Sequence, residues 1–134
     1  MNFLAKLLGW GKQASRQRSF LTGEDREQIR DRWEKIGQLE EVGKPSAWRE
    51  AVIEADKLVD FALAKIYPGE EKTANRLVQA KEVFASYKQE YENLWYAHKI
   101  RNEMVHTVGF ELPSVEAKNI LEYFKRSLEI LGVL

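Results

Sequence analysis

One segment of the chain, PSAWREAVIEADKLVDFALAKI at residues 45–66, constrains the fold more than any other. Its apolar side chains recur at spacings of three or four residues, and Leu58 and Leu63 widen the resulting stripe. This period predicts an α-helix with one buried face, which Ser46 would cap at its N-terminus. The stripe comprises Trp48, Val52, Ala55, Val59, Ala62 and Ile66.

The stretch LTGEDREQIRDRWEKIGQLEEVG predicts another helix before this segment. Thr22 suits its N-terminal cap, and Glu24 and Asp25 would meet the positive end of the helix dipole. Gly43 is a typical residue at the end of such a helix. The expected apolar stripe comprises Ile29, Trp33, Ile36 and Leu39 or Glu40.

Three further helices are expected later in the chain, at residues 73–87, 91–106 and 114–134. Thr73 and Ser114 are the expected caps of the first and last of these. Nowhere does the sequence alternate polar and apolar residues with the period of two that is typical of strands. The residues expected to face inward are Ala74, Leu77, Ala80, Val83 or Phe84, then Leu94, Ala97, Ile100 or Arg101, Met104, and finally Ala117, Ile120 or Leu121, Phe124, Leu128 and Leu131.

These elements predict an all-α protein built on an antiparallel four-helix bundle, because short loops join neighbouring helices that run in opposite directions. We divide the chain into three parts on this basis. Residues 1–20 form a short basic amphipathic arm, residues 21–44 an extra leading helix with its linker, and residues 45–134 the bundle.

The composition narrows the chemistry that this fold can carry. The chain has no cysteine, which excludes a disulfide framework, a thiolate zinc site and a cysteine nucleophile. It also has no glycine-rich phosphate loop, and we expect neither a cofactor nor a metal. The formal net charge is zero, but residues 1–20 carry only basic groups, so the remaining chain is acidic. A strongly basic nucleic-acid-binding surface is therefore not expected on the body.

The arm at residues 1–20 combines its basic groups with apolar side chains at helical spacing. Its apolar part is too short to span a bilayer, which needs about 20 residues. Three interpretations stay open: a helix that packs on the body or a partner, an interfacial helix at a membrane surface, and an organelle-targeting peptide. We expect a cytoplasmic protein, either free or held peripherally at the inner face of a membrane.

The stretch KIRNEMVH contains the residues with the clearest chemical potential, Arg101, Asn102 and His106. The planar fork of arginine binds two oxygens of a phosphodiester, and histidine transfers protons near neutral pH. Asparagine can orient either side chain or bind a phosphate oxygen. Because RNA supplies its own nucleophile, the 2′-hydroxyl, such a group of residues could cleave RNA without a metal.

The spacing of these residues leaves alternatives open. On one straight helix, positions five apart lie about 140° apart around the axis, whereas Asn102 and His106 share a face. Arg101 and His106 would converge through the long reach of arginine, a helix that ends near His106, or a second copy across a twofold axis. In the structural alternative, Arg101 pairs with an acid of a neighbouring helix and His106 only sits at a helix end. His98 could line the face of Asn102 or be a satisfied, half-buried histidine.

The stretch RNEMVH lies late in the third of the four expected core helices and is followed by a loop and a last amphipathic helix. In this position it resembles the R-x(4–6)-H motif of HEPN domains (higher eukaryote and prokaryote nucleotide-binding), in which a polar residue often follows the arginine. The stretches AWREAVIEADKLVDFALAKI and AHKIRNEMVHTVGFELPSVEAKNILEYFKRSLEIL also look like parts of small bacterial HEPN-like proteins. The resemblance covers about residues 45–134.

This resemblance implies a homodimer whose two motifs face each other in a cleft. It implies a metal-independent endoribonuclease of the toxin or defence type, with RNA as substrate and an antitoxin or other protein as partner. Carried over by position, Arg101 would hold the scissile phosphate, His106 would act as general acid or base, and Asn102 would support them. The alternative is a non-catalytic homodimeric interaction module, tethered to a membrane surface or partner by residues 1–20.

Overall fold

The computed structural model describes residues 21–134, in which every regular element is helical. This confirms the expected all-α class, while the expected arm at residues 1–20 lies outside the described residues. None of the helices in the described part is both long and apolar enough to cross a lipid bilayer. The elements are α2 (Gly23–Glu41), α3 (Pro45–Ile66), α4 (Thr73–Gln79), the 3₁₀ helix η2 (Ala80–Glu82), α5 (Lys88–His106) and α6 (Ser114–Ile130).

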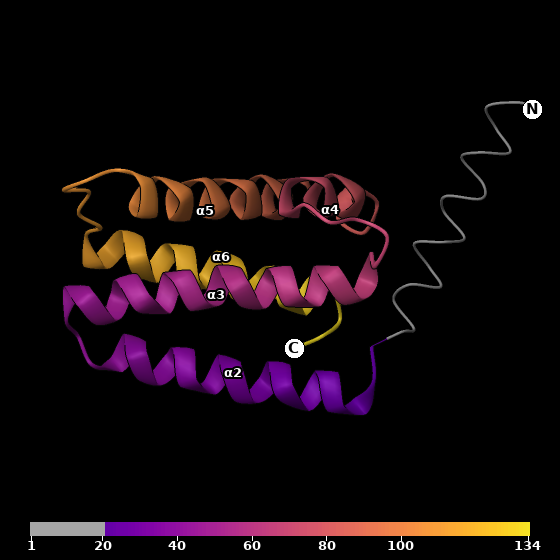
Figure 1. Cartoon of the computed structure of the whole chain (residues 1–134), viewed down its shortest axis with the longest axis horizontal. Helices are drawn as coiled ribbons and strands as arrows, with labels where there is room; N and C mark the ends of the chain where they lie inside the picture. Colours follow the sequence, from indigo (N-terminus) through magenta and orange to yellow (C-terminus); the bar gives the residue numbers. More distant parts are fainter. Residues whose placement is uncertain (1–20) are drawn as a thin grey trace, which may run out of the picture.

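The four long helices lie side by side, and α3 contacts each of the other three (Figure 1). α2 packs on one side of α3, α5 and α6 also pack against each other, and α4 packs on α3 near the end of that helix. Short loops join α2 to α3 and α5 to α6 at one end of the molecule, whereas α4 and η2 lie at the other (Figure 1). Helices joined by such short connections run antiparallel.

The core is built mainly from the inner faces of α3 and α6. Apart from Trp48, which is only half-buried, the stripe expected on α3 is buried, and so is the stripe expected on α6. On α2, Ile29 and Ile36 are buried, and Trp33 and Leu39 pack against the core at its edge. Ala74 was expected to face inward but is exposed, because α4 is short and buries only Leu77.

The helix expected over residues 73–87 is shorter than its sequence period predicts. Its regular part ends at Gln79 and continues as the tighter turn of η2. The N–H of Phe84 lies 3.3 Å from the carbonyl oxygen of Ala80 and 3.2 Å from that of Lys81, so it is shared between the two. This tightening turns the phenyl ring of Phe84 into the core, where it is 1% exposed.

Thr22 caps α2 as expected. Its hydroxyl oxygen accepts a hydrogen bond from the backbone N–H of Asp25 at 3.0 Å, and the Asp25 carboxylate accepts from the N–H of Thr22 at 3.1 Å. This reciprocal pair is a capping box, which satisfies two backbone donors that the helix itself leaves open. The same backbone hydrogen bond to the carboxylate lowers the pKa of Asp25.

The other three expected caps are wrong by one or two residues. The N-terminal caps of α3, α4 and α6 are Lys44, Lys72 and Pro113, and none of them makes a side-chain capping bond. In α3 the proline at residue 45 occupies the first helical turn, where its missing N–H and fixed φ are tolerated best. Ser46, Thr73 and Ser114 therefore lie inside their helices.

We expect Thr22→Ala to lower the melting temperature of the protein. The loss of a capping hydroxyl costs about 1 kcal/mol, which corresponds to roughly 3–5 °C for a domain of this size. Ser114→Ala is the matched control and should change the melting temperature little, because no capping bond of Ser114 is lost. Equal shifts for the two variants in thermal unfolding followed by circular dichroism would contradict the capping box.

A hydrogen bond from the Tyr96 hydroxyl to the Glu116 carboxylate joins α5 to α6. This bond raises the pKa of Tyr96 to about 12, because ionisation would place two negative charges together. A pKa raised in the folded state stabilises the fold below the ordinary tyrosine pKa of 10, and this contribution is lost as the pH rises through about 12. We expect spectrophotometric titration to show a late tyrosinate signal that Tyr96→Phe removes and Glu116→Gln moves to lower pH. A signal that Glu116→Gln leaves in place would contradict the contact.

Candidate functional site

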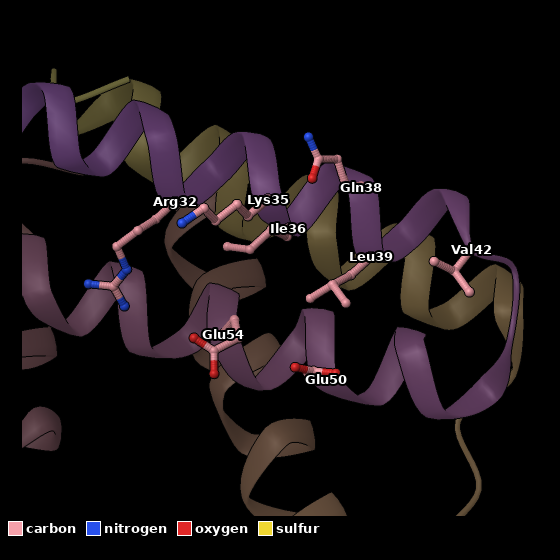
Figure 2. Close-up of a pocket in the computed structure, with 8 residues that line it drawn as sticks. All are labelled: Arg32, Lys35, Ile36, Gln38, Leu39, Val42, Glu50 and Glu54. Carbon is pink, nitrogen blue, oxygen red and sulfur yellow. The ribbon is translucent and has the colours of Figure 1, made fainter.

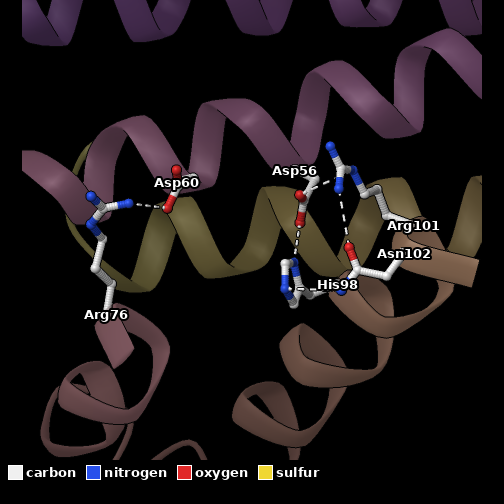
Figure 3. A network of polar contacts seen from close by, with 6 residues as sticks. All are labelled: Asp56, Asp60, Arg76, His98, Arg101 and Asn102. Carbon is white, nitrogen blue, oxygen red and sulfur yellow. Dashed lines mark hydrogen bonds and ion pairs between the residues drawn. The ribbon is translucent and has the colours of Figure 1, made fainter. Parts of the chain in front are cut away.

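Three polar side chains of α5 face α3 and form a closed ring with Asp56 (Figure 3). The Arg101 Nη1 donates to Asn102 Oδ1 at 3.0 Å, and Asn102 Nδ2 lies 3.4 Å from His98 Nε2. The His98 Nδ1 lies 2.7 Å from Asp56 Oδ1. The ring closes where Arg101 Nε lies 3.4 Å from Asp56 Oδ2.

Donors and acceptors agree at the three contacts of His98, Asn102 and Arg101 Nη1, and the fourth contact, from Arg101 Nε to Asp56, is an ion pair without a hydrogen bond. A carboxylate only accepts, so the short contact to Asp56 places the imidazole hydrogen of His98 on Nδ1. The lone pair of His98 Nε2 then faces the Asn102 amide nitrogen, which donates toward it. The remaining Asn102 oxygen accepts from Arg101, whose charge also faces the other Asp56 oxygen. Each contact therefore fixes the orientation of the next.

The ring is only partly accessible to solvent. The side chains of Asp56, His98 and Arg101 are 9%, 14% and 24% exposed. A carboxylate buried to this extent is costly unless it is paired, and His98 and Arg101 provide the two partners. Within residues 21–134 the only hydrogen bond of the Arg101 guanidinium is the one from Nη1 to Asn102. Nε is buried and faces Asp56 as an ion pair without a hydrogen bond, and Nη2 donates to no residue of this range. The guanidinium is thus oriented by the protein and still has donors for an anion.

A second aspartate on α3 shows how a purely structural arginine is bound. Asp60 accepts from Arg76 Nη1 at 2.8 Å (Figure 3). Arg76 also donates from Nε to the carbonyl oxygen of Glu70 at 2.9 Å and from Nη2 to that of Glu71 at 3.2 Å. All three of its nitrogens are therefore used to hold the loop between α3 and α4. Arg101 differs because only its Nη1 makes a hydrogen bond within the described residues.

The structure brings together Arg101, Asn102 and His98 but leaves His106 outside the ring. His106 is the last residue of α5, and it is exposed. It follows Asn102 by one helical turn, so the two share a face as the sequence spacing predicts. Arg101 lies on the side of α5 that faces α3, where it pairs with Asp56. The expectation that His98 is half-buried and satisfied is confirmed.

The hollow between α2 and α3 is not suited to bind a charged ligand. This hollow sets Arg32 and Lys35 opposite Glu50 and Glu54 over an apolar floor that includes Ile36 (Figure 2). Its charges balance, so it does not favour an anion or a cation. Within residues 21–134 no three histidine, aspartate or glutamate side chains lie close enough to hold a metal ion.

A larger groove runs along α4, η2 and the first half of α5 and is lined mainly by apolar atoms. Its aromatic wall includes Tyr91 and Trp95. The Trp95 ring meets the His98 ring edge-on at a centroid distance of 6.4 Å, so the groove ends beside the ring. Its rim carries Lys81 and Lys88 together with two glutamates, and its net charge is therefore balanced.

Comparison with known proteins finds no relative of this chain. No protein-family model matches the chain, and no curated protein or solved structure is significantly similar to it. The function is therefore argued from the chemistry of the site.

Asp56 is the site residue that the sequence analysis did not single out. Its partner His98 lies 42 residues further along the chain, and helical periodicity cannot predict a contact over that distance. One signal was present in the sequence. Asp56 follows Ala55 directly and Val52 by four residues, so it lies on the edge of the apolar stripe. An acid in that position is buried on folding and needs a cation or a hydrogen-bond donor from another helix.

Proposed function

We propose that the chain is a HEPN-like four-helix bundle and acts as a homodimeric, metal-independent endoribonuclease. The observation that carries this proposal is the half-buried guanidinium of Arg101, held by Asp56 and Asn102 while its Nη2 stays open. A guanidinium fixed in this way is suited to a phosphodiester oxygen, because it is always charged and presents donors in a planar fork. The RNEMVH stretch ends α5 and is followed by a loop and α6, and this order supports the same proposal.

In the proposed reaction, the 2′-oxygen of RNA attacks the adjacent phosphorus. A bond from phosphorus to the 2′-oxygen forms, and the bond to the 5′-oxygen of the next nucleotide breaks. Arg101 neutralises the charge that develops on the phosphoryl oxygens, which is the main contribution of such a donor to catalysis. His106 either accepts the proton of the 2′-hydroxyl or donates one to the departing 5′-oxygen, and solvent water takes up or supplies the other proton. Asn102 orients the arginine.

The position of His106 supports the proposed dimer. It is exposed at the end of α5, about 140° around the helix axis from Arg101, so a second copy is the simplest way to complete the site. Exposed apolar side chains flank this end of the molecule at Val105, Val108 and Val115. Apolar surface of this kind favours a protein contact, with a second copy or with an antitoxin. Sedimentation should give about twice the monomer mass of 15.6 kDa.

The experiment that tests the proposed function compares single-stranded RNA with DNA of the same sequence, both incubated with purified protein in EDTA. We expect cleavage of RNA and no cleavage of DNA, because DNA lacks the 2′-hydroxyl that acts as nucleophile. Cleavage of both polymers, or of neither across a varied RNA pool, would contradict the proposal.

A second candidate function is a non-catalytic homodimeric interaction module. The ion pair between Arg101 and Asp56 favours it, because a paired and half-buried arginine is also typical of a structural contact. In this case the basic amphipathic residues 1–20 would tether the protein to a partner or to the inner face of a membrane, with the body in the cytoplasm. Co-sedimentation with anionic liposomes, with and without residues 1–20, tests the tether. Equal binding by both chains, or no binding by either, would exclude it.

A further inference from the structure

We infer that Asp56 and His98 are positioning residues, which fix Arg101 and Asn102 in the orientation that meets the RNA phosphate. The inference rests on the proposed function and adds two residues outside the R-x(4–6)-H stretch to its machinery. Neither residue reaches the phosphate in this account. Both act through the ring of contacts between α3 and α5.

Asp56 is the fixed point of the ring. It lies in the middle of α3, and its side chain is 9% exposed, so the surrounding core restricts its rotamer. Its two oxygens face partners from successive turns of α5, His98 at 2.7 Å and Arg101 at 3.4 Å. A long arginine side chain loses much conformational entropy when it is held in one place. A preformed contact to Asp56 meets part of that cost before RNA binds.

His98 connects the fixed point to the asparagine amide. Because its Nδ1 hydrogen is directed at Asp56, its Nε2 lone pair faces Asn102 and selects one of the two amide orientations. In that orientation the Asn102 oxygen points at Arg101 Nη1. The opposite orientation would set the amide donors against the guanidinium donors. His98 thus determines that the oxygen of the Asn102 amide, and not its nitrogen, faces Arg101.

The ring differs from a structural ion pair because it leaves hydrogen-bond donors of its arginine unused. The Arg76 nitrogens are all used by Asp60 and two backbone carbonyls, whereas Arg101 Nη2 is not used within residues 21–134. Arg101 Nε is in addition buried without a hydrogen bond in the described residues, which is costly for a contact that serves stability alone. The open donor, next to three constrained groups, is the arrangement expected of a prepared anion site.

The first test measures the ring itself and needs no RNA. Nitrogen chemical shifts of the His98 imidazole distinguish a protonated Nδ1 from a protonated Nε2 in the full-length protein. We expect hydrogen on Nδ1 in the wild type, and loss of this preference in Asp56→Asn. His98 with its hydrogen on Nε2 would overturn the inference, because Nε2 could not accept from Asn102.

The second test measures cleavage of RNA in EDTA. We expect Asp56→Asn to lower kcat roughly 10- to 100-fold with a smaller change in KM, because misplacement of a catalytic group by about 1 Å has an effect of this size. Asp60→Asn is the matched control, since it breaks an arginine pair one turn along the same helix without touching Arg101. All variants are compared at a temperature where circular dichroism shows each of them folded.

Two substitutions of His98 separate positioning from packing. His98→Asn keeps a donor near the place of Nδ1, facing Asp56, whereas His98→Ala removes both ends of the connection. Partial recovery of kcat in His98→Asn relative to His98→Ala supports positioning. Equal kcat values for Asp56→Asn and Asp60→Asn, with an active wild type, would overturn the inference alone. A wild type with the ring in place and no cleavage of any RNA would overturn the proposed function, and the ring would then be structural.

Discussion

Arg101→Lys is expected to lower RNA cleavage on the order of 10²- to 10³-fold while the protein stays folded. Lysine keeps a positive charge beside the buried Asp56, so the carboxylate is not left without a counter-charge. It lacks the planar fork, however, and cannot face Asp56, Asn102 and a phosphate at once. The loss should appear mainly in kcat, which single-turnover cleavage in EDTA would measure.

Arg76→Lys is the control for this substitution. It makes the same chemical change in an arginine that also pairs with an aspartate of α3 but has no open donor. We expect a modest loss of stability and unchanged cleavage. Full activity in Arg101→Lys, or the same loss in both variants, would mean that Arg101 is not a phosphate ligand.

The largest expected change in stability comes from Phe124→Ala. Phe124 lies on the inner face of α6 and is completely buried, in the layer where α6 packs on α3 and α5. Removal of a buried phenyl ring leaves a cavity and costs about 3–5 kcal/mol. This is a large part of a typical unfolding free energy of about 5–15 kcal/mol. Urea unfolding should show a much lower midpoint with a similar slope.

Glu122→Ala is the control for the core substitution, because Glu122 is on the same helix and its side chain is exposed. It should change the free energy of unfolding by less than about 0.5 kcal/mol, as is usual for surface positions. A loss below about 1 kcal/mol in Phe124→Ala would contradict the packing of α6 as described.

The sequence predicted the helices well because their apolar periodicity is strong. In α3 and α6 apolar residues recur every three or four positions, so that each turn repeats the same apolar face, and burial of that face is the main reason why the helices form. The end points were less predictable. A serine or threonine near a helix start predicts a cap by its residue type. In α3, however, Pro45 already lies in the first helical turn, so the cap is Lys44, and in α6 the cap is Pro113.

The site was predictable only in part. The local spacing in α5 places Asn102 and His106 on one face, and the residue types of the stretch predict Arg101 as an anion ligand. The partner of Arg101 could be anticipated as a type, an acid of a neighbouring helix, but not as Asp56. Which turn of α3 faces which turn of α5 depends on the packing of the whole core, and no local pattern encodes that register.

The most direct test of the account is the identification of the RNA ends that the wild-type protein produces in EDTA. Attack by the 2′-oxygen predicts a 2′,3′-cyclic phosphate on the upstream fragment and a 5′-hydroxyl on the downstream fragment, with both products greatly reduced in Arg101→Lys and His106→Ala. Fragments with 3′-hydroxyl and 5′-phosphate ends would contradict the account, as would cyclic-phosphate ends produced equally by all three proteins.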